Sequence, residues 1–186
     1  LCQSWKRNFV QFQKVASAEL PDNGSAWDVN PSDVFIRVNA FIERCGEIKE
    51  FLSAARCYQK IDPNRVVFGA SKGLQLTEHL GNIYGRFQKA AKDIRSVKYD
   101  ITDIDAEAFD VDFFAFRQKI KQLDRTLAAM LIDSYEDNET VLSRMDLMYV
   151  FEDMLKRPEI QDEMEKKETK LLFDYRDELL AVQAKF

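Results

Sequence analysis

A glycine-rich stretch is the first candidate for chemistry in this sequence. Residues 69–73 read GASKG, a composition found in loops that bind phosphate. A Walker loop needs the order G-x-x-x-x-G-K-[ST], so that backbone amides surround the phosphates and the lysine reaches the terminal one. The order and spacing here are different, and no parallel sheet is predicted before the stretch. We therefore expect the glycines only to turn the chain into a following helix.

Two other patterns contain residue types that bind metal ions. His79 is the only histidine, and without a second histidine or a nearby cysteine pair a zinc site is not expected. An acidic run contains Asp100, Asp103, Asp105, Glu107, Asp110 and Asp112. This run lacks the glycine and the spacing of an EF-hand calcium loop. Its carboxylates are expected to cap and charge-match the N-terminus of a helix that begins near residue 106.

Charge and cysteine content narrow the classes of partner. The net charge of -5 disfavours broad binding to nucleic acid or to anionic membranes, because both require a basic surface. The three cysteines form no C-x-x-C pair, which is typical of reduced thiols in a cytosolic compartment. No apolar stretch has the length of a membrane span. We therefore expect a cytoplasmic protein with neither nucleic acid nor a membrane as its partner.

Three segments repeat apolar residues at alternating steps of four and three. This spacing keeps one narrow apolar stripe, here called a seam, on one face of an α-helix, as side-by-side helix packing requires. The seam residues expected in the core are Val38, Phe41, Ile48, Leu52, Leu80, Ile83, Phe87, Phe109, Phe113, Phe116, Ile120, Leu123 and Leu127. The sequence thus predicts an all-α fold. We expect an elongated array of long antiparallel helices in successive bundles, about six helices with no sheet.

Glycine, proline and asparagine clusters set the expected helix boundaries. Helices are expected over about 1–18, 32–58, 74–97, 106–135, 140–156 and 158–186, with Ser32 as an N-cap and Pro158 in a first turn. The β-like stretch 65–68 is too short and isolated to form a sheet. Three helices in 1–97 and three in 105–186 are expected to flank a linker at 98–104. Both ends of the sequence have helical patterns, so we expect an internal fragment of a longer polypeptide.

A set of short markers occurs along the chain in a fixed order. They are Trp27-Asp28, Val34-Phe35 with Arg37, Phe41-Ile42-x-Arg44, Phe68-Gly69 with Gly73 and Leu76, Tyr99-Asp100 with Asp105, Phe109-x-x-Asp112-x-x-x-Phe116, Leu123-Asp124-Arg125-x-Leu127, and Leu155-x-Arg157-Pro158-x-Ile160. In this order and spacing the sequence resembles the N-terminal tail region of dynein heavy chains. It resembles the axonemal chains more than the cytoplasmic one. The resemblance covers nearly the whole chain.

The resemblance implies a structural role within a microtubule motor. Dynein heavy chains carry a C-terminal ring of ATPase modules and a microtubule-binding stalk, and no motif of these parts can be placed on this sequence. Their tail is a rod of helical bundles that holds heavy chains together, carries intermediate and light chains and anchors the complex to its cargo. In cilia that cargo is the doublet microtubule. The resemblance therefore implies that residues 1–186 are a non-enzymatic tail segment without a cofactor, located in the axoneme of a cilium or flagellum.

The partners that the resemblance implies are other dynein subunits, namely heavy, intermediate and light chains, or axonemal docking proteins. Trp5, Trp27 and Tyr149 lie outside the seams and are candidate interface residues, although each could equally belong to the core. A stand-alone coiled-coil or spectrin-like adaptor without a motor is an alternative function. A metal-dependent hydrolase built on bundle carboxylates is a second alternative. It would need Glu-x-x-His spacing, whereas His79 directly follows Glu78.

Overall fold

Helices account for most of the residues that the computed structural model describes, which are 1–19, 31–61, 68 and 72–185. They are α1 (Cys2–Glu19), α2 (Pro31–Lys60), α3 (Gly73–Ser96), α4 (Ala108–Asp137), α5 (Val141–Val150), α6 (Glu152–Leu155) and α7 (Pro158–Gln183). No strand occurs within these ranges, so the predicted all-α class is confirmed. The described residues form seven helices, where about six were expected.

A break at Phe151 accounts for the additional helix. We expected one helix over residues 140–156, but α5 ends at Val150 and α6 begins at Glu152. No glycine or proline marks this break. Phe151 is 1% exposed, and its ring stacks against Phe68 with the ring centroids 6.0 Å apart. The break therefore accompanies a tertiary contact, which a local sequence pattern does not report.

The other helix starts follow local chemistry. The side chain of Thr140 caps α5, since its hydroxyl oxygen accepts a hydrogen bond of 3.1 Å from the Ser143 N–H. Pro158 opens α7 as expected, at a position where a missing N–H costs no helical hydrogen bond. Because α2 already begins at Pro31, Ser32 lies inside its first turn and is not the N-cap that we predicted. Residues 65–67 of the predicted β-like stretch lie outside the described residues.

The chain divides into two compact units. The first unit comprises Leu1–Phe51 and Tyr99–Asp110, and the second comprises Leu52–Lys98 and Val111–Phe186. Helices α2 and α4 each contribute residues to both units. The division into 1–97 and 105–186 around a linker stays a prediction from the helical pattern.

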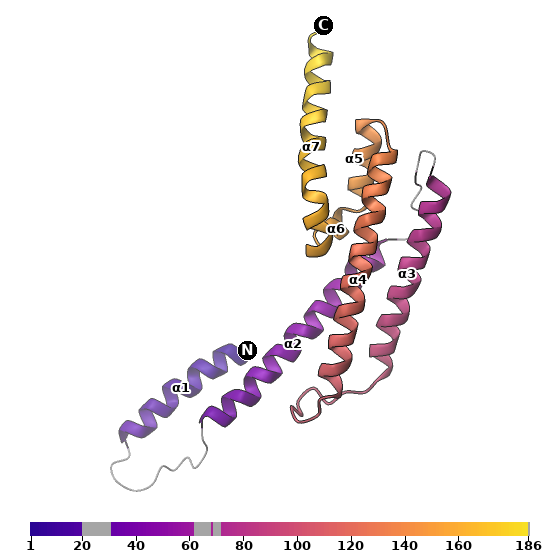
Figure 1. The fold of residues 1–186 in the computed structure, drawn as a ribbon. Helices are drawn as coiled ribbons and strands as arrows, with labels where there is room; N and C mark the ends of the chain where they lie inside the picture. The colour runs from indigo at the N-terminus through magenta and orange to yellow at the C-terminus, as the bar shows by residue number, and fades with distance from the viewer. Residues whose placement is uncertain (20–30, 62–67, 69–71, 186) are drawn as a thin grey trace. The chain divides into compact units, whose positions relative to one another are not determined.

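In the first unit, α1 lies beside the first part of α2 (Figure 1). The Lys6 ammonium donates a hydrogen bond of 2.7 Å to the side-chain oxygen of Asn39. The ring of Phe9 meets that of Phe35 edge-on, with their centroids 5.5 Å apart. The Lys6 ammonium also lies over the Phe35 ring, 5.2 Å from its centroid, so polar and aromatic contacts together join the two helices.

The second unit has an apolar core built from α3, α4 and the helices that follow. Its most buried side chains include those of Leu80, Ile83, Phe113, Leu123, Leu127, Met130, Leu131, Met154, Ile160 and Met164. Burying one Leu or Phe side chain contributes roughly 1.5–3 kcal/mol to stability. The end of α2 joins this core through Tyr58, whose ring stacks on that of Phe87 with centroids 4.2 Å apart.

Candidate functional site

The described part of the glycine-rich stretch at 69–73 consists of Lys72 and Gly73. Residues 69–71 lie outside the described residues. The Lys72 N–H donates to a carboxylate oxygen of Asp137 at 2.9 Å, and the Lys72 ammonium lies 3.8 Å from Asp133. A Cβ atom at Gly73 would lie 2.4 Å from the carbonyl oxygen of Phe68, so this glycine permits a close backbone approach. The lysine thus faces acidic side chains, and Gly73 serves the turn into α3.

The acidic run organises a loop of the first unit. The Asp100 carboxylate accepts hydrogen bonds from the backbone N–H and the hydroxyl of Thr102, which lower the pKa of Asp100. The Asp103 carboxylate accepts a bond of 3.1 Å from the Asp105 N–H. These are turn contacts, and they differ from the capping of a helix start near residue 106 that we expected. Only Asp110 of the run lies in the first turn of α4.

Neither a metal site nor a membrane span occurs in the described part of the chain. No group of three or more His, Cys, Asp and Glu side chains is arranged there to hold a metal ion. His79 is exposed on α3. None of the described helices is both long and apolar enough to cross a bilayer.

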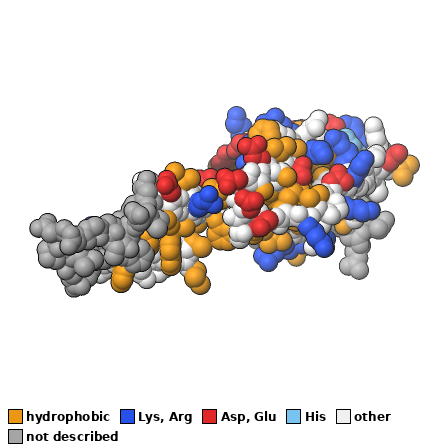
Figure 2. Space-filling view, turned by 90° about the horizontal axis from the view of Figure 1, so that it is seen from below, with side chains coloured by type: hydrophobic (Ala, Val, Ile, Leu, Met, Phe, Trp, Pro, Cys, Tyr) orange, Lys and Arg blue, Asp and Glu red, His pale blue; other side chains and the backbone are white. Residues whose placement is uncertain are grey.

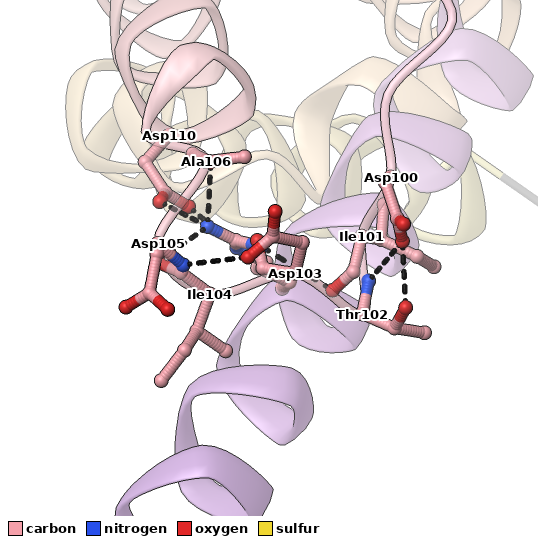
Figure 3. A network of polar contacts seen from close by, with 9 residues as sticks. Asp100, Ile101, Thr102, Asp103, Ile104, Asp105, Ala106 and Asp110 are labelled. Carbon is pink, nitrogen blue, oxygen red and sulfur yellow. Dashed lines mark hydrogen bonds and ion pairs between the residues drawn. The ribbon is translucent and has the colours of Figure 1, made fainter.

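Arg44 of α2 holds the loop that contains Asp100, Asp103 and Asp105 through a set of contacts that we call the Arg44 anchor (Figure 3). Its guanidinium donates to the backbone carbonyl oxygens of Ile101, Asp103, Ile104 and Ala106, at 3.3, 2.6, 3.4 and 3.0 Å, and to both carboxylate oxygens of Asp110, at 3.0 and 2.7 Å. The Arg44 side chain is only 3% exposed. One side chain therefore gathers the whole turn and the start of α4.

The chemistry of the Arg44 anchor requires a guanidinium. Arginine presents five N–H donors in a planar fork, whereas lysine presents three donors on one nitrogen atom. The hydrogen bond with Asp110 raises the pKa of Arg44, and this outweighs the opposing effect of burial. The charge is thus both neutralised and hydrogen-bonded, which a buried charge needs in order to be tolerated.

A second buried set, the Asp124 anchor, lies in the second unit and consists of Tyr58, Asp124 and Arg157. The Asp124 carboxylate is 2% exposed and accepts hydrogen bonds from the Tyr58 hydroxyl at 2.9 Å and from Arg157 at 2.7 and 2.9 Å. Tyr58 is on α2, Asp124 is on α4 and Arg157 directly precedes α7. One carboxylate therefore ties three helices together.

The electrostatics of the Asp124 anchor favour one charge state for each member. Burial, together with the neighbouring Asp124 charge, raises the pKa of Tyr58, so the phenol stays protonated and donates. Burial lowers the pKa of Arg157, but its hydrogen bond and its attraction to Asp124 raise that pKa by more. The anchor contains one buried ion pair and one neutral donor, and it has no spare group for acid–base chemistry.

Sequence reasoning placed Arg44, Asp124 and Arg157 among the markers of a family but assigned them no role. A signal for the first two is present in the sequence. Arg44 follows Phe41 by three residues, and Asp124 follows Ile120 by four, so both charged residues fall on the apolar face of a helix. A charge on such a face is retained only where a specific partner meets it.

The seam residues differ in exposure. Leu80, Ile83, Phe87, Phe109, Phe113, Phe116, Ile120, Leu123 and Leu127 are each at most 4% exposed. Val38, Phe41 and Ile48 are partly exposed on α2. Leu52 is 49% exposed, so the seam pattern is wrong in placing it in the core. Its position keeps the helical spacing, but no described neighbour covers it fully.

The candidate interface residues lie at the surface where they are described. Trp5 is 44% exposed and Tyr149 is 79% exposed, while Trp27 lies outside the described residues. Tyr149 borders a groove of about 380 Å³ between α5, α6 and α7. Figure 2 shows that hydrophobic side chains reach the surface between charged ones.

The family model and the individual relatives that match this chain all describe dynein heavy chains. A family model described as the dynein heavy chain, N-terminal region 1, matches residues 1–186. The chain is 33% identical over 176 residues to the dynein beta chain of the flagellar outer arm of Chlamydomonas reinhardtii, and 26% identical over 184 residues to the dynein-1-beta heavy chain of its inner arm I1 complex. These matches cover 95% and 99% of this chain.

A human relative matches as well. The chain is 29% identical over 138 residues, 74% of its length, to dynein axonemal heavy chain 17 of Homo sapiens. The matched regions span only 4% of the two Chlamydomonas proteins and 3% of the human one.

Proposed function

Because this chain belongs to the family of the dynein heavy chain N-terminal region, we propose that it is a structural and assembly segment of an axonemal heavy-chain tail. The observation that carries the proposal is the position of the two anchors. Arg44, Asp124 and Arg157 occur in the ordered markers of the family resemblance, and each makes a buried contact that fixes helices. Their contacts build a scaffold and leave no reactive group.

A mechanical role fits the helices themselves. Helices α2 and α4 each contain 30 residues without a proline beyond the first position. At 1.5 Å per residue, each is about 45 Å long. We propose that such continuous helices transmit force between an ATPase motor elsewhere in the heavy chain and the doublet microtubule.

The relatives suggest the location and the partners. Their names place them in flagellar arms, cilia and axonemes. We propose the same location for this chain, with heavy, intermediate and light chains of dynein or axonemal docking proteins as its partners. Since the chain spans so little of its relatives, the activity of the motor is attributed to the rest of the heavy chain.

Affinity capture tests this function. Tagged residues 1–186 are incubated with proteins extracted by salt from ciliary axonemes, and bound proteins are identified by mass spectrometry. A tagged spectrin repeat of similar charge is the control, because it is helical and belongs to another family. We expect dynein intermediate or light chains, or another heavy chain, to be enriched on tagged residues 1–186 and not on the spectrin control. A well-folded chain that captures no dynein subunit would contradict the proposal.

A further inference from the structure

The groove between α5, α6 and α7 is a surface that neither anchor uses. It is lined by Met145, Met148 and Tyr149 of α5, Glu152 and Leu155 of α6, and Glu168, Leu171, Leu172 and Tyr175 of α7. All of these residues belong to the second unit. Leu155 and Leu171 are buried and form its floor, whereas Tyr149 and Leu172 are 79% and 71% exposed at its edges. The groove therefore offers apolar contact area to solvent.

An exposed apolar stripe on α7 begins in the lining of this groove and continues along the helix beyond it. Leu172, Tyr175, Leu179 and Val182 follow one another by three, four and three residues, which places them on one face of the helix. Each of the four is at least 41% exposed. The stripe spans 11 residues, whose ends lie about 15 Å apart along the helix axis. Its length and spacing suit about three turns of a second helix lying against it.

The charge of the groove is acidic. Glu152 and Glu168 are its only charged lining residues, and no Lys, Arg or His lines it. Glu152 pairs with Lys156 at 2.8 Å. Among the described residues, none donates a hydrogen bond to the side-chain carboxylate of Glu168 or forms an ion pair with it. Partial burial and the neighbouring Glu165 raise the pKa of Glu168, so its carboxylate lies in surroundings that disfavour negative charge. A cation placed there would relieve this cost.

We propose that this groove receives an amphipathic helix of a partner subunit, which inserts apolar side chains between α5 and α7 and places a Lys or Arg beside Glu168. Grooves that bind amphipathic helices recognise apolar anchors at steps of three and four residues. Two methionines in the lining suit such a surface, because their flexible side chains adapt to a bound partner. A second copy of this chain is a poorer occupant, since a symmetric contact between two grooves brings their carboxylates together.

The inference rests on the proposed function, in which the chain binds other dynein subunits. Its test uses the chain of residues 1–186 and a fluorescein-labelled designed helical peptide of about 18 residues. The peptide has leucines at the spacing of the α7 stripe and lysines beside them. A twin peptide carries glutamates in place of the lysines. Binding is measured by fluorescence anisotropy at low salt and at physiological salt.

We expect the basic peptide to bind roughly tenfold or more tightly than its acidic twin. Leu172→Asp is expected to lower the affinity for the basic peptide roughly tenfold relative to the wild-type chain. Glu168→Lys is expected to abolish the preference for the basic over the acidic peptide. Phe173→Asp is the matched control, because Phe173 is 52% exposed and adjacent in sequence, but points away from the stripe. Circular dichroism checks that each variant keeps its helical content.

Three results would overturn the inference. The first is equal binding of the two peptides or no binding of either. The second is an equal effect of Leu172→Asp and Phe173→Asp. The third is a dimer of the chain in analytical ultracentrifugation that Leu172→Asp dissociates, which would assign the groove to a second copy.

The capture experiment separates this inference from the proposed function. If the Leu172→Asp variant no longer binds the peptide but still captures the same dynein subunits, the proposed function stands and the groove is not the site of capture. If the wild-type chain binds the peptide but captures no dynein subunit, the proposed function fails while the peptide preference of the groove remains.

Discussion

Arg44 and Asp124 are charged residues on otherwise apolar helix faces, and each has partners that meet its hydrogen-bonding needs. Arg44 uses its donors on four backbone carbonyls and one carboxylate, all within the first unit. Asp124 accepts from a phenol and a guanidinium within the second unit. Breaking one partner of such a set costs more than the contact itself contributes, because it leaves a buried charge unpaired.

Removing the negative charge of Asp124 tests the second anchor. Asp124→Asn keeps the size of the side chain but leaves Arg157, which is 15% exposed, without its counter-charge. We expect the free energy of unfolding to fall by about 3 kcal/mol. Urea denaturation followed by circular dichroism measures it. Asp146→Asn, at an exposed position of α5, is the control and should change stability little. Equal effects of the two substitutions would show that the buried pair is not structural.

Arg44→Lys tests the first anchor. The ammonium keeps the charge but cannot reach the same number of acceptors, so the turn 101–106 should open more often. Losing one or two hydrogen bonds to a charged group costs about 1.5–3 kcal/mol, which corresponds to roughly tenfold to hundredfold faster hydrogen exchange in the turn. Mass spectrometry of exchanged peptides measures this rate.

The matched control for Arg44→Lys is Arg37→Lys. Arg37 also lies on α2 and faces the same loop, at 3.7 Å from Asp105, but both side chains are well exposed. Exposed pairs contribute little. Exchange in the turn should therefore stay near the wild-type rate. If both substitutions accelerate it equally, burial of Arg44 has no special role.

At the scale of the helices, the periodicity of apolar residues predicts the position of most helices. The steps of four and three place α3 and α4 correctly to within two residues at each end and mark their buried face. The break at Phe151 was missed because no glycine or proline marks it, and the contact that accompanies it is with Phe68, 83 positions away in sequence. Leu52 was misplaced because spacing gives the face of a residue but not whether a neighbour covers it.

Phe116→Ala tests the seam of α4. Phe116 is 4% exposed, so its removal leaves a cavity in the second unit. We expect a loss of roughly 3–5 kcal/mol in the free energy of unfolding, measured by urea or thermal denaturation. Phe114→Ala is a close control, because Phe114 lies two residues away on the same helix and is 61% exposed. An unmoved melting curve for Phe116→Ala, or equal shifts for both variants, would disprove the seam assignment.

At the scale of the whole molecule, the sequence resemblance and the structure point to the same residues. The resemblance rested on the order of short markers, among them Arg44, Asp124 and Arg157, and the family match over residues 1–186 confirms it. The geometry adds a physical reason for these markers. Their partners could not be predicted, because the contact of Arg44 with Asp110 and that of Asp124 with Arg157 join residues 66 and 33 positions apart.

The groove could not be predicted from the sequence either. The candidate residue Tyr149 was chosen as an aromatic outside the seams, but the carboxylates of Glu152 and Glu168 were not linked to it. Their proximity depends on how α5 and α7 pack after the break at Phe151. Local spacing gives the face of each helix, and only tertiary packing brings two such faces together.

The measurement that tests the central claim most directly is cross-linking mass spectrometry on the intact axonemal dynein that contains this chain. The complex is extracted from axonemes and treated with a lysine-reactive reagent. Exposed lysines such as Lys166 and Lys170 of α7 report which proteins lie close to the segment. The account predicts cross-links from these lysines to another heavy chain or to an intermediate or light chain. Cross-links confined to the heavy chain itself, in a complex whose other subunits are otherwise linked, would contradict an assembly role for this segment.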